Sequence, residues 1–198
     1  MSDVETLRKG VEKSLPELAL IEDSELRLKV AQAWAIALSE TEYGSIEDIR
    51  ASALPDDPLM KRGTQADHIR ATTQIALAQA EAIERVFGPI GIDHDLLVAG
   101  ALVHDVGKPY EFSPRNQARW KADPSAAGIP AVRHPVYGVH IALLVGLPEP
   151  VVHIVGAHAM SREGAYVKPS LENVIVQYAD SVMWRILKAA GLVEPEES

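Results

Sequence analysis

Two adjacent side chains of types that bind metal ions follow an apolar run in the middle of the chain. Residues 99–103 read Ala-Gly-Ala-Leu-Val, and His104 and Asp105 come directly after them, followed by Val-Gly-Lys108. Neighbouring residues on a helix point about 100° apart, so both side chains can reach one ion at the end of that helix. The alternative is a helix C-terminus with a polar cap, in which Gly107 ends the helix and the Lys108 charge complements its dipole.

A second carboxylate lies among residues that are expected to be buried. Asp180 stands in the sequence Val-Ile-Val-Gln-Tyr-Ala-Asp-Ser-Val-Met-Trp, residues 174–184. Burying an isolated carboxylate is unfavourable, so Asp180 needs an Arg partner, a helix to cap or a bound cation. Together with His68 and the pair His104 and Asp105, it offers three or four nitrogen and oxygen ligands from three separate helices. That number suffices for a divalent cation with open water positions.

These side chains must be positioned by helices, because apolar residues recur at helical spacing along most of the chain. No segment of the sequence alternates in the way of a strand, so the chain is predicted to be all-α. We expect helices over residues 3–15, 24–44, 65–87, 93–106, 135–146, 148–158 and 171–190, a short helix from 45, and a long loop over 108–130. The expected organisation is an N-terminal helical appendage (1–62), a main helical domain (63–191) and a flexible tail (192–198).

The order of these residues resembles the HD-domain superfamily of metal-dependent phosphohydrolases. The resemblance rests on His68, on His104 and Asp105 followed by Val-Gly-Lys, and on Asp180, in this order. It covers roughly residues 63–190. It implies an all-α HD-domain helical bundle. The sequence His-Pro-Val-Tyr-Gly from His134 resembles the family's His-x-x-x-Gly helix start. Val-Gly-Ala-His, ending at His158, resembles the helix that carries a further histidine in members with two metals.

In such members, the resemblance implies, Asp105 bridges two ions. One ion is completed by His68, His104 and Asp180, and the other by His134 and His158. Ala159 stands where some two-metal subfamilies have a second histidine, which argues against a third ion and against the cyclic-dinucleotide activity of that branch. The ligand types suit Fe, Mn, Zn, Mg or Ni, so the metal stays open. Structural or solvent roles are expected for the remaining histidines, His94, His140 and His153.

Two cations about 3.5–4 Å apart would lower the pKa of a shared water towards neutrality and would bind an anionic leaving group. We therefore expect a hydrolase of a small phosphorylated substrate, either a phosphomonoester or a nucleotide, with a metal-bridging hydroxide as the nucleophile. Lys108 is expected to contact a substrate oxygen, with a helix-end charge as its alternative role. Arg133 and Arg162 lie beside predicted ligand helices and can orient a phosphate or carboxylate, or stand on the surface.

Two other functions stay open at this stage. Some HD-fold proteins with a similar six-ligand set are mixed-valent di-iron oxygenases that cleave C–C or C–P bonds, and the ligand types do not separate these from hydrolases. A regulatory module that binds a ligand without turnover is the third reading. A missing ligand would favour it, and none of the six is missing.

Composition restricts the partners. The chain has 28 acidic and 19 basic residues, a formal charge of −9, which argues against binding a nucleic-acid polymer and favours a small anionic substrate. It has no Cys, so any metal must be held by His, Asp and Glu. No stretch approaches the length of a membrane span, and we expect a cytoplasmic protein. The stripe around Trp34, residues 26–38, is expected to pack on the bundle, with a homodimer interface as the alternative.

Overall fold

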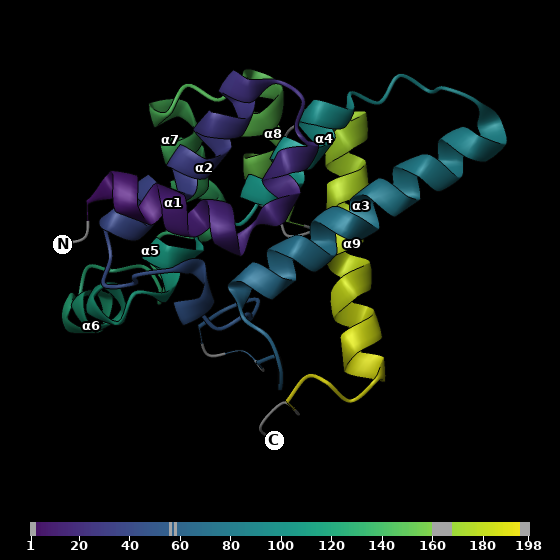
Figure 1. Ribbon diagram of the computed structural model, residues 1–198. Helices are drawn as coiled ribbons and strands as arrows, with labels where there is room; N and C mark the ends of the chain where they lie inside the picture. Colours follow the sequence, from purple (N-terminus) through teal and green to yellow (C-terminus); the bar gives the residue numbers. More distant parts are fainter. Residues whose placement is uncertain (1–2, 56, 58, 160–167, 195–198) are drawn as a thin grey trace.

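The computed structural model describes residues 3–55, 57, 59–159 and 168–194, and within these residues its regular elements are all helices. The all-α prediction is therefore confirmed (Figure 1). The elements are α1 (Val4–Ser14), the 3-10 helix η1 (Pro16–Leu20), α2 (Ser24–Ser39), the 3-10 helix η2 (Ile46–Asp48), α3 (Gln65–Phe87), α4 (His94–Val103), α5 (Lys108–Phe112), α6 (Pro114–Ala122), α7 (His134–Leu144), α8 (Glu149–Ala157) and α9 (Leu171–Ala189).

Local capping residues set the helix ends that matter for the site. Thr64 and Asp67 form a capping box at the start of α3, and Gly88, with φ of 81°, ends it. Asp93 begins α4 by accepting a hydrogen bond from the backbone N–H of Leu96 at 3.0 Å. The capping box of Thr64 and Asp67 fixes the first turn of α3, where the predicted ligand His68 lies, and Asp93 fixes the start of the helix that leads to His104.

The segment 108–130 was expected to be a long loop, and this expectation is wrong for residues 108–122. It contains α5 and α6, with Pro109 and Pro114 in the first two positions of these helices. A proline there breaks no hydrogen bond, because the first N–H groups of a helix have no partner within it. The Ser113 hydroxyl also accepts from the backbone N–H of Asn116 at 3.3 Å, which caps α6.

The N-terminal helices share one hydrophobic core with the rest of the bundle. Trp34 of α2 is fully buried, and its indole N–H donates to the carbonyl of Leu102 on α4 at 2.7 Å. Residues of α1 and α2 pack in the same cluster as those of α4, α7 and α8. The Trp34 stripe therefore packs on the bundle as expected, and it is not available as a surface for a second copy.

The start of the expected tail, residues 192–194, pairs with the segment before α3. The Lys61 N–H donates to the Leu192 carbonyl at 2.8 Å, and the Glu194 N–H donates to the Leu59 carbonyl at 2.9 Å. Residues 195–198 of that predicted tail lie outside the described residues. Two backbone hydrogen bonds thus attach the chain after α9 to the N-terminal segment.

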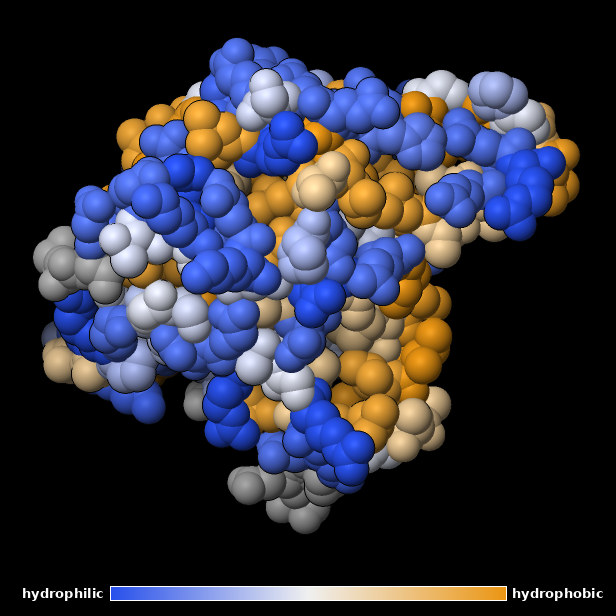
Figure 2. Space-filling view, viewed as in Figure 1, coloured by the Kyte–Doolittle hydropathy of each residue, from blue (hydrophilic) through white to orange (hydrophobic). Residues whose placement is uncertain are grey.

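Helices α3 and α9 pack across each other at one side of the bundle, and the outer end of α3 extends beyond it (Figure 1). Figure 2 shows apolar surface at that end and along α9. Val86 and Phe87 on α3 are 72% and 74% exposed. Their exposure shows that the last turn of α3 adds little to the core, whereas its first turn is buried against the other helices. None of the described helices is long and apolar enough to cross a membrane.

Candidate metal centre

Six predicted ligands from five parts of the fold converge at one place. They come from the first turn of α3, the end of α4, the start of α7, the end of α8 and the middle of α9. Five of them are buried, and the side chain of the sixth, Asp180, is 24% exposed. The six are His68, His104, Asp105, His134, His158 and Asp180.

The carboxylate of Asp105 is at the centre of this cluster, with a pair of histidines facing each oxygen. Its Oδ2 atom lies 3.2 Å from Nε2 of His68 and 3.7 Å from Nε2 of His104. Its Oδ1 atom lies 3.1 Å from Nε2 of His134 and 3.5 Å from Nε2 of His158. The donors therefore form two groups that share Asp105, and each group has the arrangement needed to hold a metal ion.

Three of the four histidines have their other ring nitrogen engaged, which orients the ring. Nδ1 of His104 and Nδ1 of His158 each face a backbone carbonyl one turn back, at 2.7 and 2.9 Å. Nδ1 of His134 faces the carboxylate of Glu111. Because a carbonyl or carboxylate can only accept, these Nδ1 atoms carry the proton. In the neutral rings, each Nε2 atom then presents a lone pair to the cluster.

The arrangement fits a bound cation. Nε2 of His134 and Nε2 of His158 lie 3.3 Å apart, so two lone pairs face each other when both rings are neutral. Oδ1 of Asp180 is buried without a hydrogen-bond partner among the described residues, 3.5 Å from Nε2 of His68. Ligands held at about 2.0–2.2 Å from one ion lie roughly 3.0–3.6 Å from each other, which matches these separations. A divalent cation would satisfy the lone pairs and this carboxylate.

Burial and neighbouring charges favour the metal-binding protonation states of three ligands, His104, Asp105 and His134. Burial lowers the pKa of His104 to about 4, and it holds the pKa of His134 well below its usual value. Burial raises the pKa of Asp105, but the charge of Lys108 and the contacts with the neighbouring histidines hold it well below its usual range. At His158 burial lowers the pKa, but the hydrogen bond with Asp105 and the charges of Asp105 and Asp180 raise it overall.

Glu111 was not predicted to orient a metal ligand. It is fully buried on α5, where its carboxylate accepts hydrogen bonds from the Arg133 guanidinium and from the backbone N–H of His134 at 2.9 Å. Burial raises the pKa of Glu111. Its contact with Nδ1 of His134 is the carboxylate–histidine arrangement that orients metal ligands in proteins. A helix beginning at Pro109 would have placed Glu111 one turn after Lys108, and this was the available signal.

A cavity of about 360 Å³ opens beside the ligands. Two of its wall residues, Trp184 and Arg185, belong to α9 and were not predicted from the sequence. The ring centroid of Trp184 lies 5.5 Å from that of His68. Besides four of the predicted ligands, the wall consists of Ser52, Ala53, Lys108, Arg133, Ala159, Ser181, Trp184 and Arg185.

The three predicted substrate contacts differ in their positions. Lys108 is buried in the cavity wall, and its ammonium donates to the carbonyls of Ser52 at 2.8 Å and Ala53 at 2.7 Å. Arg133 lines the cavity and pairs with Glu111. Arg162 lies outside the described residues. A substrate contact for Lys108 stays a prediction, and its visible role is to hold the N-terminal segment beside the ligands.

The other three histidines lie away from the cluster. His94 pairs with Glu84 on α3, with 3.1 Å between the ring nitrogen and the carboxylate. His140 is exposed on α7. Nε2 of His153 accepts a hydrogen bond from the backbone N–H of Ser170 at 3.2 Å, just before α9. All three therefore have structural or solvent positions.

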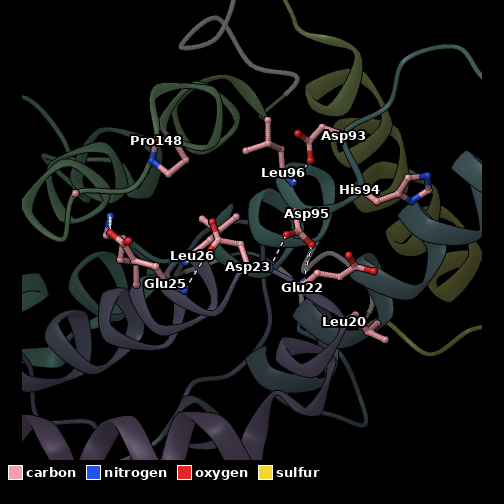
Figure 3. A pocket seen from close by; sticks show the side chains of 12 residues that line it. Leu20, Glu22, Asp23, Glu25, Leu26, Asp93, His94, Asp95, Leu96 and Pro148 are labelled. Atoms are coloured by element: carbon pink, nitrogen blue, oxygen red, sulfur yellow. Dashed lines mark hydrogen bonds and ion pairs between the residues drawn. The ribbon is translucent and has the colours of Figure 1, made fainter.

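A larger cavity, of about 710 Å³, lies elsewhere between the starts of α2 and α4. Figure 3 shows that carboxylates line it. The Asp95 carboxylate accepts from the backbone N–H groups of Glu22 and Asp23 at 2.7 and 2.8 Å, and Asp23 and Asp93 cap α2 and α4. These carboxylates stabilise local structure and would repel a phosphate, so we assign the functional site to the smaller cavity beside the histidines.

Comparison with known proteins identifies the family of the chain. The family model for the HD domain matches residues 66–184. The dihydroneopterin 2',3'-cyclic phosphate phosphodiesterase of Methanocaldococcus jannaschii is 29% identical over 126 residues, which cover 60% of this chain and 45% of that protein. The matched part is therefore less than half the length of this relative. No solved structure shows significant similarity to the chain. Because the family match spans more than half of the sequence, the chain belongs to the HD-domain family.

Proposed function

We propose that the chain is a metal-dependent phosphohydrolase of a small phosphate ester, with two divalent ions held on either side of Asp105. The division of the donors between the two oxygens of Asp105 is the strongest support for two ions. The M. jannaschii relative, named as a phosphodiesterase of a cyclic phosphate, supports a phosphoester as the substrate. The donor set alone does not select among Fe, Mn, Zn, Mg and Ni.

Divalent cations, when bound here, would activate water and stabilise the negative charge that develops during phosphoryl transfer. The protein's own residues would hold the cations and orient the groups around them. Asp105 stays ionised because the charge of Lys108 opposes the effect of burial on its pKa. Glu111 fixes the ring of His134 and also binds Arg133, which places the Arg133 guanidinium at the cavity wall. A planar guanidinium there suits the non-bridging oxygens of a phosphate.

The cavity sets the size of the substrate. About 360 Å³ is within the range of roughly 300–1,000 Å³ that is usual for small-molecule sites. The net charge of −9 disfavours a nucleic-acid polymer, since binding its backbone requires an extended basic surface. We therefore propose a small phosphomonoester, nucleotide or cyclic phosphate as the substrate.

Metal analysis of protein purified without chelator, followed by assays on phosphomonoesters, phosphodiesters and cyclic phosphates with added Mn²⁺, tests this function. We expect hydrolysis by the wild type and by His94→Ala, and its loss together with bound metal in Asp105→Ala. A metal-loaded protein that turns over no phosphoester would refute the proposal. The same ligands suit iron, so a di-iron oxygenase is the alternative function. Oxygen uptake by an iron-loaded sample with substrate would support it. Turnover without oxygen by a Zn- or Mn-loaded sample would exclude it.

A further inference from the structure

Trp184 and Arg185 lie about one turn beyond the ligand Asp180 on α9 and line the cavity. We propose that these two residues determine substrate selectivity: Arg185 binds an anionic oxygen of the substrate, and Trp184 packs against a planar ring in its esterified group. This inference rests on the proposed function, because it concerns how a phosphate ester binds beside the metal ligands.

Arg185 differs from the other two cations of the described cavity wall. The ammonium of Lys108 is buried and donates to two backbone carbonyls. The guanidinium of Arg133 pairs with the buried carboxylate of Glu111. Arg185 is exposed, and within the described part of the chain it makes no hydrogen bond or ion pair. Its N–H donors are thus available to a ligand, in the fork geometry that binds two oxygens of a phosphate.

Trp184 differs from the other two tryptophans of the chain. Trp34 and Trp120 are 0% and 6% exposed and belong to the buried core, whereas Trp184 is only partly buried. It lies four residues after Asp180, so both side chains point to the same side of α9. Its ring is tilted by 33° against that of His68, which holds it at the edge of the ligand cluster. An indole fixed in a cavity wall offers a surface on which a planar ring can stack.

Binding of two phosphonates to the Zn-loaded protein separates the two roles. Methylphosphonate carries only the anionic group, and 4-nitrobenzylphosphonate adds an aromatic ring; neither has an ester bond to hydrolyse. We expect Arg185→Ala to weaken both by about 10- to 100-fold, the range for a lost charge-assisted hydrogen bond. Arg185→Lys should recover part of this loss, because it keeps the charge without the fork. Arg85→Ala on the exposed end of α3 is the matched control and should change neither.

For Trp184 the measured quantity is the ratio of the two affinities. The wild type should prefer the aromatic phosphonate by on the order of 10-fold, as is typical of stacking on an aromatic side chain. Trp184→Leu, which keeps apolar volume beside His68, should bring the ratio close to one. The nitrobenzyl ring should also quench tryptophan emission in the wild type and in Trp120→Phe, but not in Trp184→Phe.

Metal content is measured for every variant, because replacing a residue that only supports the metal ligands would lower the amount of bound metal. Equal affinities for Arg185→Ala and Arg85→Ala would overturn the role of Arg185. An unchanged ratio in Trp184→Leu, or loss of metal from that variant, would overturn the role of Trp184, since the residue would then only support His68. A wild type that binds the phosphonates in this pattern but hydrolyses no phosphate ester would refute the proposed function and leave the binding roles standing.

Discussion

Gly107 lies between the His-Asp pair and α7, at a point where there is no room for a side chain. A Cβ atom at this position would lie 2.1 Å from the carbonyl oxygen of His134 and 2.8 Å from the backbone nitrogen of Gly138. Real Cβ contacts essentially never fall below 3.0 Å, so the closer of these is too short by 0.9 Å. Both neighbours are backbone atoms, and a change of rotamer therefore cannot relieve the overlap. In Gly107→Ala the backbone of residue 107 and the start of α7 must move apart.

That movement acts on one half of the proposed two-metal site. His134 is the first residue of α7, and its Nε2 atom lies 3.1 Å from Oδ1 of Asp105. Metal–ligand distances tolerate deviations of about 0.2 Å, far less than the displacement required here. We expect Gly107→Ala to lose the ion held through His134 and to keep the one held through His68, His104 and Asp180. The overpacking should also lower the free energy of unfolding by about 1–3 kcal/mol.

Metal stoichiometry by elemental analysis and the midpoint of urea unfolding measure the two effects. The matched control is Gly10→Ala in α1, where a Cβ would meet nothing within 4 Å. That substitution should keep the wild-type stoichiometry and raise the free energy of unfolding by about 0.5–1 kcal/mol, because alanine loses less conformational freedom in a helix. Two bound ions and a wild-type midpoint in Gly107→Ala would show that the position of α7 does not control the second ion.

Three further experiments test single contacts. Glu111→Gln should weaken metal binding at the His134 side by about 10- to 100-fold in a chelator-competition titration, with the other side unchanged. Asp105→Ala should lose most bound metal by elemental analysis, whereas His94→Ala should not; equal losses would mean that the ligand assignment is wrong. Trp34→Phe leaves the buried carbonyl of Leu102 without its indole donor and should lower the free energy of unfolding in urea by about 1–3 kcal/mol. An unchanged free energy of unfolding would show that this hydrogen bond does not stabilise the fold.

The helices could be predicted where their ends carry local signals and apolar residues recur at helical spacing between them. The bounds of Gln65–Phe87 follow from the apolar spacing together with Thr64 before the helix and Gly88 after it. Short helices with a proline in their first turn were not predicted. Pro109 and Pro114 were interpreted as breaks, but each stands where a helix begins, and the short helices that follow have too few turns to show a periodicity.

The metal ligands could be found because histidines and aspartates among apolar neighbours are unusual in sequence. The structure brings His68 and Asp180 together across the α3–α9 contact, and the other four predicted ligands lie around the same point. Glu111 could not be found in this way, because its burial depends on α7 packing against α5, a long-range contact that leaves no local pattern. Arg185 was missed for a similar reason: its neighbours along the sequence do not show that it borders a cavity.

Lys108 shows why the residues before α3 belong to the functional site. Lys108 is only 2% exposed, so its ammonium group needs hydrogen-bond acceptors, and the carbonyls of Ser52 and Ala53 provide them. The same two residues form part of the cavity wall, and the indole of Trp34 attaches α2 to α4 from the other side. The N-terminal segment is therefore held at two places beside the ligands. The cavity is bounded partly by Ser52 and Ala53, which precede the family match at 66–184, so part of the cavity wall lies outside that match.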